Sequence, residues 1–264
     1  MNILFIGDIV GNVGRKAVKE TLPRLKSKYK PDFIIANGEN AAAGRGITGK
    51  IANELFQLGV HGITMGNHTY GNKDIFEIID DEPRLIRPAN YTPGSPGRGY
   101  TILRNGKYEL GLINIIGRTY MAPADDPFRE AEWIIDEWKN KVTHILVDFH
   151  AEATSEKIAM GWHLDGKVTA VVGTHTHVQT HDERILPQGT AYITDVGMVG
   201  PRDGILGMER EAVMQKFLTP LPARFHVDEG KWHFHAVLIT CDATSGKANS
   251  IQIIRCEENE WVMD

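Results

Sequence analysis

The chain has 264 residues, 42% of them hydrophobic, which is enough to bury a full core, and we expect one domain over residues 1–264. Its 29 basic and 34 acidic residues leave a formal charge of −5, without a run of like charges, which argues against binding to extended nucleic acid duplexes. Its apolar runs are shorter than the roughly 18 residues of a membrane helix, so we expect no membrane span.

Secretion is also not indicated. The N-terminal "MNILFIGDIVG" lacks a basic region, and Asp8 interrupts its apolar stretch, unlike a signal peptide. Cys241 and Cys256 are too few for a disulfide scaffold, so we expect two unpaired thiols and a cytoplasmic location.

Short apolar, β-branched runs alternate with segments of helical spacing along the chain. We predict strands over residues 3–7, 33–37, 62–66, 110–117, 144–149, 169–173 and 191–197, buried on both faces, and helices over residues 15–29 and 126–141. This alternation predicts an α/β fold, a sheet flanked by helices. Residues 231–256 differ, because they read as two strands around a turn and predict a C-terminal antiparallel pair.

Polar side chains recur where these strands end. Ligands of open α/β sheets bind outside the carboxyl ends of the strands, so we expect these side chains to converge there. They are Asp8, Asn37, Glu39, Asn40, Asn67, His68, His150, His175 and His177.

The pair His175 and His177 is a weak signal by itself. Residues two apart do not share a helix face, but at a strand end both imidazoles can reach one centre. A second such pair, His233 and His235, lies in an alternating strand, where we expect a solvated strand face. The other histidines are interpreted as surface or core residues: His61, His144, His163, His181 and His226.

The motifs "GDIVG", "NGEN" and "GNH" set polar side chains beside glycines, which let the backbone approach a ligand closely. Together the strand-end residues offer two carboxylates, amide oxygens and three imidazoles, without a thiolate. Such a set suits iron, manganese or zinc better than calcium or a structural zinc site. Seven donors exceed the needs of one ion, so we predict two ions, roughly 3.5 to 4 Å apart, bridged by a carboxylate and a hydroxide.

The ordered series "GD", "NGEN", "GNH", a lone histidine after a strand, and "GTHTH" resembles the calcineurin-like dinuclear metallophosphoesterase superfamily. The similarity extends to its YmdB-type branch of 2',3'-cyclic-nucleotide phosphodiesterases in "NGENAAAGRGIT", "TMGNH", "RPANY", "DFHAEATSEK", "VVGTHTHVQT" and "YITDVGMVGPRDGILG". The resemblance implies a two-layer β sandwich of mixed sheets flanked by helices.

One position departs from the superfamily pattern. Val10 stands where the superfamily usually has a histidine, and an aliphatic side chain cannot ligate a metal. The resemblance to the branch implies that Asn40 replaces this ligand. It implies two sets, Asp8, Glu39, Asn40 and His177 for the first ion, and Glu39, Asn67, His150 and His175 for the second, with Glu39 as the bridge. Iron is the metal that the branch implies first, ahead of manganese or zinc.

The activity implied is hydrolysis of 2',3'-cyclic nucleotides, or related small phosphodiesters, by a hydroxide that the two metals activate. His68 suits the proton donor, because an unperturbed imidazole titrates near neutrality, although it could instead only orient Asn67. Two alternatives stay open: a phosphomonoesterase acting on small phosphates, and a regulatory metal-binding scaffold with little turnover. A homo-oligomer is an expectation from base rates alone.

Further candidates are less specific. Thr154 and Ser155 are interpreted equally as substrate contacts or helix caps. Arg118, Arg184 and Arg202 are interpreted as phosphate contacts or, more commonly for arginine, solvated surface residues.

Overall fold

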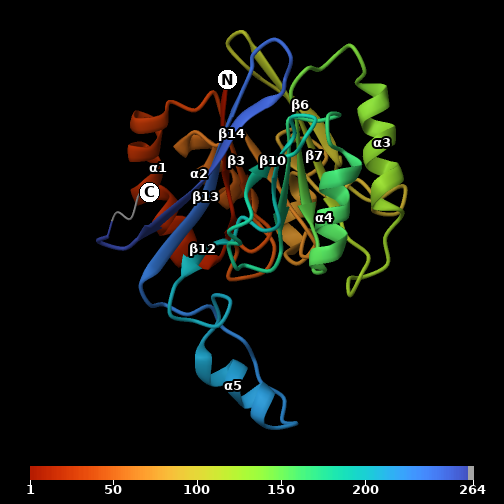
Figure 1. Cartoon of the computed structure of the whole chain (residues 1–264). Helices are drawn as coiled ribbons and strands as arrows, with labels where there is room; N and C mark the ends of the chain where they lie inside the picture. The colour runs from red at the N-terminus through yellow and green to blue at the C-terminus, as the bar shows by residue number, and fades with distance from the viewer. Residues whose placement is uncertain (261–264) are drawn as a thin grey trace.

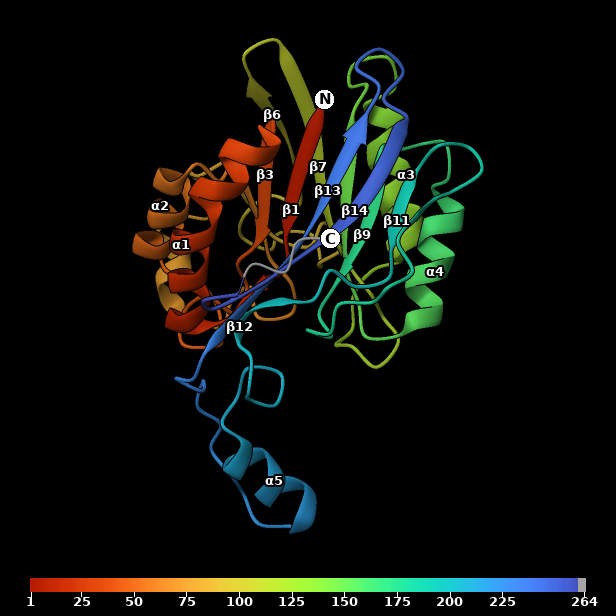
Figure 2. The same ribbon diagram turned by 60° about the vertical axis from the view of Figure 1, so that its left-hand side comes forward.

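The computed structural model describes residues 1–260 and consists of two β-sheets packed face to face, with helices on both outer sides (Figures 1 and 2). One apolar cluster lies between the sheets and draws residues from both of them. Two more clusters lie between each sheet and its helices. This arrangement confirms the predicted two-layer sandwich.

The first sheet has eight strands. Its order is β2 (Asp8–Ile9), β12 (Met198–Pro201), β13 (Trp232–Cys241), β1 (Asn2–Ile6), β3 (Phe33–Asn37), β4 (Gly62–Thr64) and β5 (Leu85–Ile86), with β14 (Ala248–Glu257) also paired to β13. Strands β1, β3, β4 and β5 are parallel, whereas β13 is antiparallel to β1, β12 and β14. The predicted C-terminal antiparallel pair is therefore confirmed, and β13 lies inside the sheet.

The second sheet has six strands, in the order β10 (Arg184–Ile185), β11 (Ala191–Ile193), β9 (Ala170–Thr174), β8 (Ile145–His150), β7 (Tyr108–Ile116) and β6 (Tyr100–Asn105). Strands β7, β8, β9 and β11 are parallel, and β6 and β10 pair antiparallel at the two edges. Both sheets are therefore mixed, as predicted.

The strands alternate between two apolar environments. Ile3 and Phe5 of β1 point between the sheets, whereas Leu4 and Ile6 lie in the cluster on the helical side. All four are fully buried, and burial of each such side chain contributes about 1.5–3 kcal/mol. Because successive side chains of a strand point to opposite faces, a strand covered on both faces needs the continuous apolar run predicted here.

Helices α1 (Gly11–Tyr29) and α2 (Gly49–Leu58) and the 3-10 helix η1 (Lys73–Glu77) cover the first sheet, and α3 (Pro127–Glu137) and α4 (Thr154–His163) cover the second (Figure 2). The Thr48 hydroxyl accepts from Ile51 N at 3.2 Å to cap α2, and the Asp126 carboxylate accepts from Phe128 N at 3.0 Å to cap α3. Only α1 and α3 were among the predicted helices.

A projecting arm departs from the sandwich. Helix α5 (Arg210–Leu218) lies on this arm, well away from both sheets (Figures 1 and 2). Phe217 and Leu218 on it are 80% and 73% exposed. The sequence pattern did not predict this arm, because its helix has no apolar face packed on the core.

The prediction of a solvated face for His233 and His235 is wrong. Both side chains are half-buried, their ring centroids lie 4.3 Å apart, and burial lowers their pKa values to about 4 and about 3. The reason is tertiary: a Cβ added at Gly197 would lie 2.6 Å from His235 Nδ1, so the chain passes directly over this face.

Two other expectations concern whole-chain properties. Cys241 and Cys256 are buried free thiols, as predicted. Within residues 1–260, every helix is too short or too polar to span a bilayer.

Candidate metal centre

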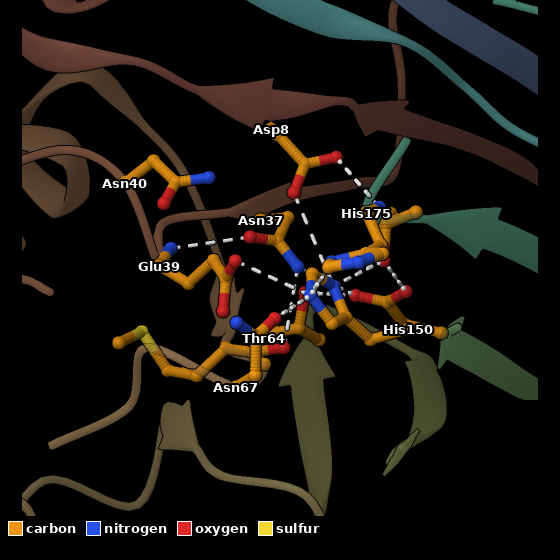
Figure 3. Close-up of polar contacts among 12 residues, drawn as sticks. Asp8, Asn37, Glu39, Asn40, Thr64, Asn67, His150 and His175 are labelled. Carbon is orange, nitrogen blue, oxygen red and sulfur yellow. Dashed lines mark hydrogen bonds and ion pairs between the residues drawn. The ribbon is translucent and has the colours of Figure 1, made fainter. Parts of the chain in front are cut away.

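The predicted site residues come from one end of both sheets. From the first sheet, Asp8 begins β2, Glu39 and Asn40 follow β3, and Asn67 and His68 follow β4. From the second sheet, His150 ends β8, and His175 and His177 follow β9. Figure 3 shows labelled members of the group, Asp8, Glu39, Asn67, His150 and His175 among them, pointing toward one another. The convergence expected at strand ends is therefore present.

The tightest part of the cluster surrounds His150 Nε2. Glu39 Oε1 lies 3.2 Å from this nitrogen, Asn67 Oδ1 lies 2.9 Å from it, and His175 Nδ1 lies 3.1 Å from it. The ligand atoms of Glu39, His150 and His175 all lie within 4.8 Å of one another, which is close enough for a shared metal ion. Four side chains thus direct oxygen or nitrogen donors at one point.

A second group lies beside it. Asp8 Oδ1 is 4.0 Å from His177 Nε2 and 4.0 Å from His150 Nδ1. The Asn40 amide places Nδ2 at 3.0 Å from His177 Nε2 and Oδ1 at 2.9 Å from His68 Nδ1. For Asn40 to offer its oxygen next to His177, the amide must turn about its terminal torsion, which is broad and roughly two-fold.

The electrostatics of the cluster fit a bound cation. Asp8 Oδ1 is buried without a hydrogen-bond partner, and burial raises the pKa of this carboxyl well above its ordinary value. Within residues 1–260, the cationic groups within 4.0 Å of Asp8 and Glu39 are histidines only. Such a buried carboxyl either takes up a proton or is stabilised as a carboxylate by a positive charge nearby, and a bound cation would supply that charge.

The surroundings shift the pKa values of His150 and His175 in opposite directions. Burial alone lowers the pKa of His150, but Glu39, Asp8 and Asp148 outweigh burial and raise it to about 9. Burial and the charge of His150 lower the pKa of His175 to about 3. The cluster therefore already holds one positive charge, as a proton on His150, and a metal ion that binds there must displace this proton.

Gly66 of the "GNH" motif leaves the space that the cluster occupies. A Cβ at this position would lie 2.4 Å from Glu39 Oε2 and 2.4 Å from His150 Nε2. Both side chains are buried, so a shift of either one would disturb its packing. The glycine is thus required for close approach, as its motif predicted.

A buried relay orients His150. Its Nδ1 lies 2.9 Å from the Thr174 hydroxyl, which in turn donates to Asp148 Oδ1 at 2.7 Å. Asp148 also accepts from Thr64 Oγ1 at 2.5 Å and from Asn37 Nδ2 at 3.2 Å. Because the hydroxyl gives its proton to Asp148, it accepts from His150 Nδ1, which leaves Nε2 free to face the cluster.

An ion pair holds the loop that carries the other two histidines. Lys157 and Asp195 are both fully buried, and Lys157 Nζ donates to Asp195 Oδ2 and to Thr174 O, each at 2.7 Å. Asp195 Oδ2 also accepts from Thr176 N at 3.1 Å and Thr176 Oγ1 at 2.8 Å. His175 and His177, on either side of Thr176, have φ values of 100° and 66°, so the backbone of this loop is strained. The ion pair stabilises the loop through the contacts of Asp195 with Thr176.

The sequence pattern did not single out these supporting residues. Asp148 had one visible signal, since a carboxylate stands inside the apolar run "ILVDFH" of a strand buried on both faces. Lys157, Thr174 and Asp195 gave none, because their roles depend on contacts between segments far apart in the chain.

The less specific candidates have separate outcomes. Helix α4 begins at Thr154 with Ala153 as its N-cap and without a side-chain cap, so the cap interpretation of Thr154 and Ser155 is wrong, and both side chains are exposed. Arg202 pairs with Asp203 and Glu257, and Arg184 lies over the rings of Trp162 and Tyr192. Arg118 NH1 lies 3.9 Å from Asp126.

Comparison with known proteins agrees with the motifs. A family model described as YmdB-like protein matches residues 4–254. A relative from Bacillus subtilis (strain 168), named 2',3'-cyclic-nucleotide 2'-phosphodiesterase, is 57% identical over 264 residues, with 100% of both chains covered.

Solved structures agree over almost the whole chain. A hypothetical protein from Thermus thermophilus is 41% identical with a TM-score of 0.92, covering 98% of this chain and 100% of that one. A structure described as a novel phosphatase from Mycoplasma pneumoniae is 35% identical with a TM-score of 0.92, covering 97% and 93%.

Proposed function

The chain belongs to the YmdB-like family, and from that membership we propose that it is a metal-dependent phosphodiesterase acting on 2',3'-cyclic nucleotides or related small phosphodiesters. The observation that carries the proposal is the cluster around His150 Nε2, where donors from two sheets meet within 3.2 Å. The name of the Bacillus subtilis relative supports the choice of substrate class.

Two ligand sets are proposed. Asp8, Glu39, Asn40 and His177 would hold a first ion, and Glu39, Asn67, His150 and His175 a second, with Glu39 shared. Oxygen and nitrogen donors without thiolate suit iron, manganese or zinc, and the resemblance to the branch puts iron first. Two observations support a cation at this site. Asp8 Oδ1 has no hydrogen-bond partner, and the acidic neighbours raise the pKa of His150 to about 9.

When bound, such ions neutralise phosphoryl oxygens and lower the pKa of a water toward 7, which supplies a nucleophile at neutral pH. The chain itself then needs to position the phosphodiester and protonate the departing oxygen. In that step the new P–O bond forms as the bond to the ribose oxygen breaks, and this oxygen takes a proton.

His68 is the proposed donor of that proton. Its side chain is 31% exposed, and Nδ1 lies 3.2 Å from Glu39 Oε1 and 2.9 Å from Asn40 Oδ1. Glu39 Oε1 only accepts hydrogen bonds, so Nδ1 carries a proton whichever way the Asn40 amide is turned, and the protonated ring presents Nε2–H as the acid. Glu39 Oε2 also accepts from His68 N at 2.8 Å, which fixes the backbone of the donor.

The alternative is a phosphomonoesterase acting on small phosphates, which the description of the Mycoplasma pneumoniae structure as a phosphatase favours. Parallel assays with a 2',3'-cyclic nucleotide and the matching monoester separate the two. The proposal expects much higher kcat/KM for the cyclic diester.

The decisive experiment is elemental analysis of protein purified without added metal, coupled to cyclic-nucleotide hydrolysis before and after chelation. About two ions per chain and chelator-sensitive turnover are expected. Metal-loaded protein that binds a phosphodiester without cleaving it would instead indicate a regulatory scaffold. His68→Ala should retain both ions while losing turnover, and loss of metal in this variant would contradict the acid role.

A further inference from the structure

The three clustered imidazoles share one arrangement: each has one nitrogen toward the cluster and the other on an oxygen atom. The outer nitrogen of His150, Nδ1, contacts the Thr174 hydroxyl at 2.9 Å. That of His177, also Nδ1, contacts Leu206 O at 3.1 Å. These oxygens belong to a hydroxyl group and a backbone carbonyl, so both are neutral.

His175 is turned the other way. Its Nδ1 lies 3.1 Å from His150 Nε2 and therefore faces the cluster, while its Nε2 lies 3.1 Å from Glu152 Oε2. A carboxylate can only accept, so its position 3.1 Å from Nε2 favours the tautomer with the proton on Nε2, which leaves a free lone pair on Nδ1. Glu152 is thus the one charged group among the three outer partners.

The chain connection explains how Glu152 reaches this place. It follows His150, the last residue of β8, by two positions and precedes α4. The strand end that supplies one imidazole therefore also supplies the partner of another. The Glu152 side chain is 49% exposed, whereas that of His175 is 20% exposed, so the carboxylate lies at the outer rim of the cluster.

We propose that Glu152 is a positioning residue that holds His175 with Nδ1 toward the metal centre and strengthens binding of the ion shared by Glu39, Asn67, His150 and His175. The inference rests on the proposed metal centre. Outer carboxylate partners fix the tautomer and ring orientation of a ligating histidine and raise its basicity. The backbone of His175, with φ at 100°, does not fix the ring by itself, because the side-chain torsions remain free.

The test uses Glu152→Ala, Glu152→Gln and the control Glu137→Ala, which removes an equally negative, exposed side chain from the end of α3. Each protein, loaded with Mn²⁺, is dialysed against a series of chelator concentrations, and the ions retained per chain are counted. Glu152→Ala should lose one of its two ions at about 10- to 100-fold lower chelator strength than wild type. Glu152→Gln keeps an accepting oxygen and should lie closer to wild type, and Glu137→Ala should match wild type.

Thermal unfolding of the chelated proteins separates positioning from stability. All four proteins should then unfold at the same temperature, because Glu152 is half exposed and its proposed effect needs the metal. Unchanged ion retention in Glu152→Ala would overturn the inference and leave the proposed function standing. Equal ion loss in both Glu152 variants would show that an accepting oxygen at this place does not hold the ring, which also overturns it. Wild type that binds no metal would overturn both.

Discussion

Replacing Thr174 by valine tests whether the buried relay holds His150. The two side chains have nearly the same shape, so the variant removes only the hydroxyl. Two fully buried groups then lose a partner: Asp148 Oδ1, which accepts from this hydroxyl at 2.7 Å, and His150 Nδ1, which lies 2.9 Å from it. A buried group left unsatisfied costs about 1–3 kcal/mol, and two such groups about 2–6 kcal/mol.

The same change frees the ring that aims Nε2 at the cluster. We expect the metal affinity of Thr174→Val to fall by about 10- to 100-fold, as for other outer partners of ligating histidines. For a chain of this size, a loss of about 4 kcal/mol lowers the melting temperature by roughly 8–16 °C. Calorimetry of the chelated protein measures the loss of stability, and chelator competition measures the loss of metal affinity.

Thr169→Val is the matched control. Thr169 directly precedes β9, whereas Thr174 is the last residue of this strand. The buried hydroxyl of Thr169 accepts from Ile145 N at 3.2 Å, at the end of β9 away from the cluster. This variant should lose stability but bind metal as wild type does. Equal metal affinity in the two threonine variants would refute the relay.

Three further outcomes follow from the geometry. Gly66→Ala should abolish metal binding, because its Cβ would lie 2.4 Å from Glu39 Oε2 and His150 Nε2, and retention of two ions would show that the cluster can shift. The pKa values of His233 and His235, lowered by burial to about 4 and about 3, keep both rings neutral in the folded state. The stability that these two neutral rings contribute is therefore complete above about pH 6.5 and falls below it as the unfolded chain takes up protons, by about 1.4 kcal/mol per pH unit for each ring. Urea titrations at pH 7.5 and 5.5 should show a smaller loss for His235→Asn than for wild type, and equal losses would contradict the assignment. Chelation should lower the melting temperature, because an ion at 100 times its Kd stabilises the folded state by about 2.7 kcal/mol, and an unchanged midpoint would argue against a bound ion.

The sequence predicted those features that depend on local pattern. Continuous apolar runs identified seven of the strands that pair in parallel, but not the short strands β2, β5 and β12. The polar residues at the strand ends identified the donors that converge there. The connections within the cluster were not predictable in this way. Lys157 and Asp195 meet only because α4 packs beside β9, and His233 and His235 are covered only because the loop at Gly197 crosses β13.

The division of the cluster between two sheets has a consequence for the order of assembly. A partly folded chain with only the first sheet formed would present Asp8, Glu39, Asn40 and Asn67 without any imidazole of the second. A chain with only the second sheet would present His150, His175 and His177 without Asp8 or Glu39. On the proposed metal centre, high-affinity uptake would therefore come after the two halves of the sandwich have docked, and the bound ions would then slow their separation.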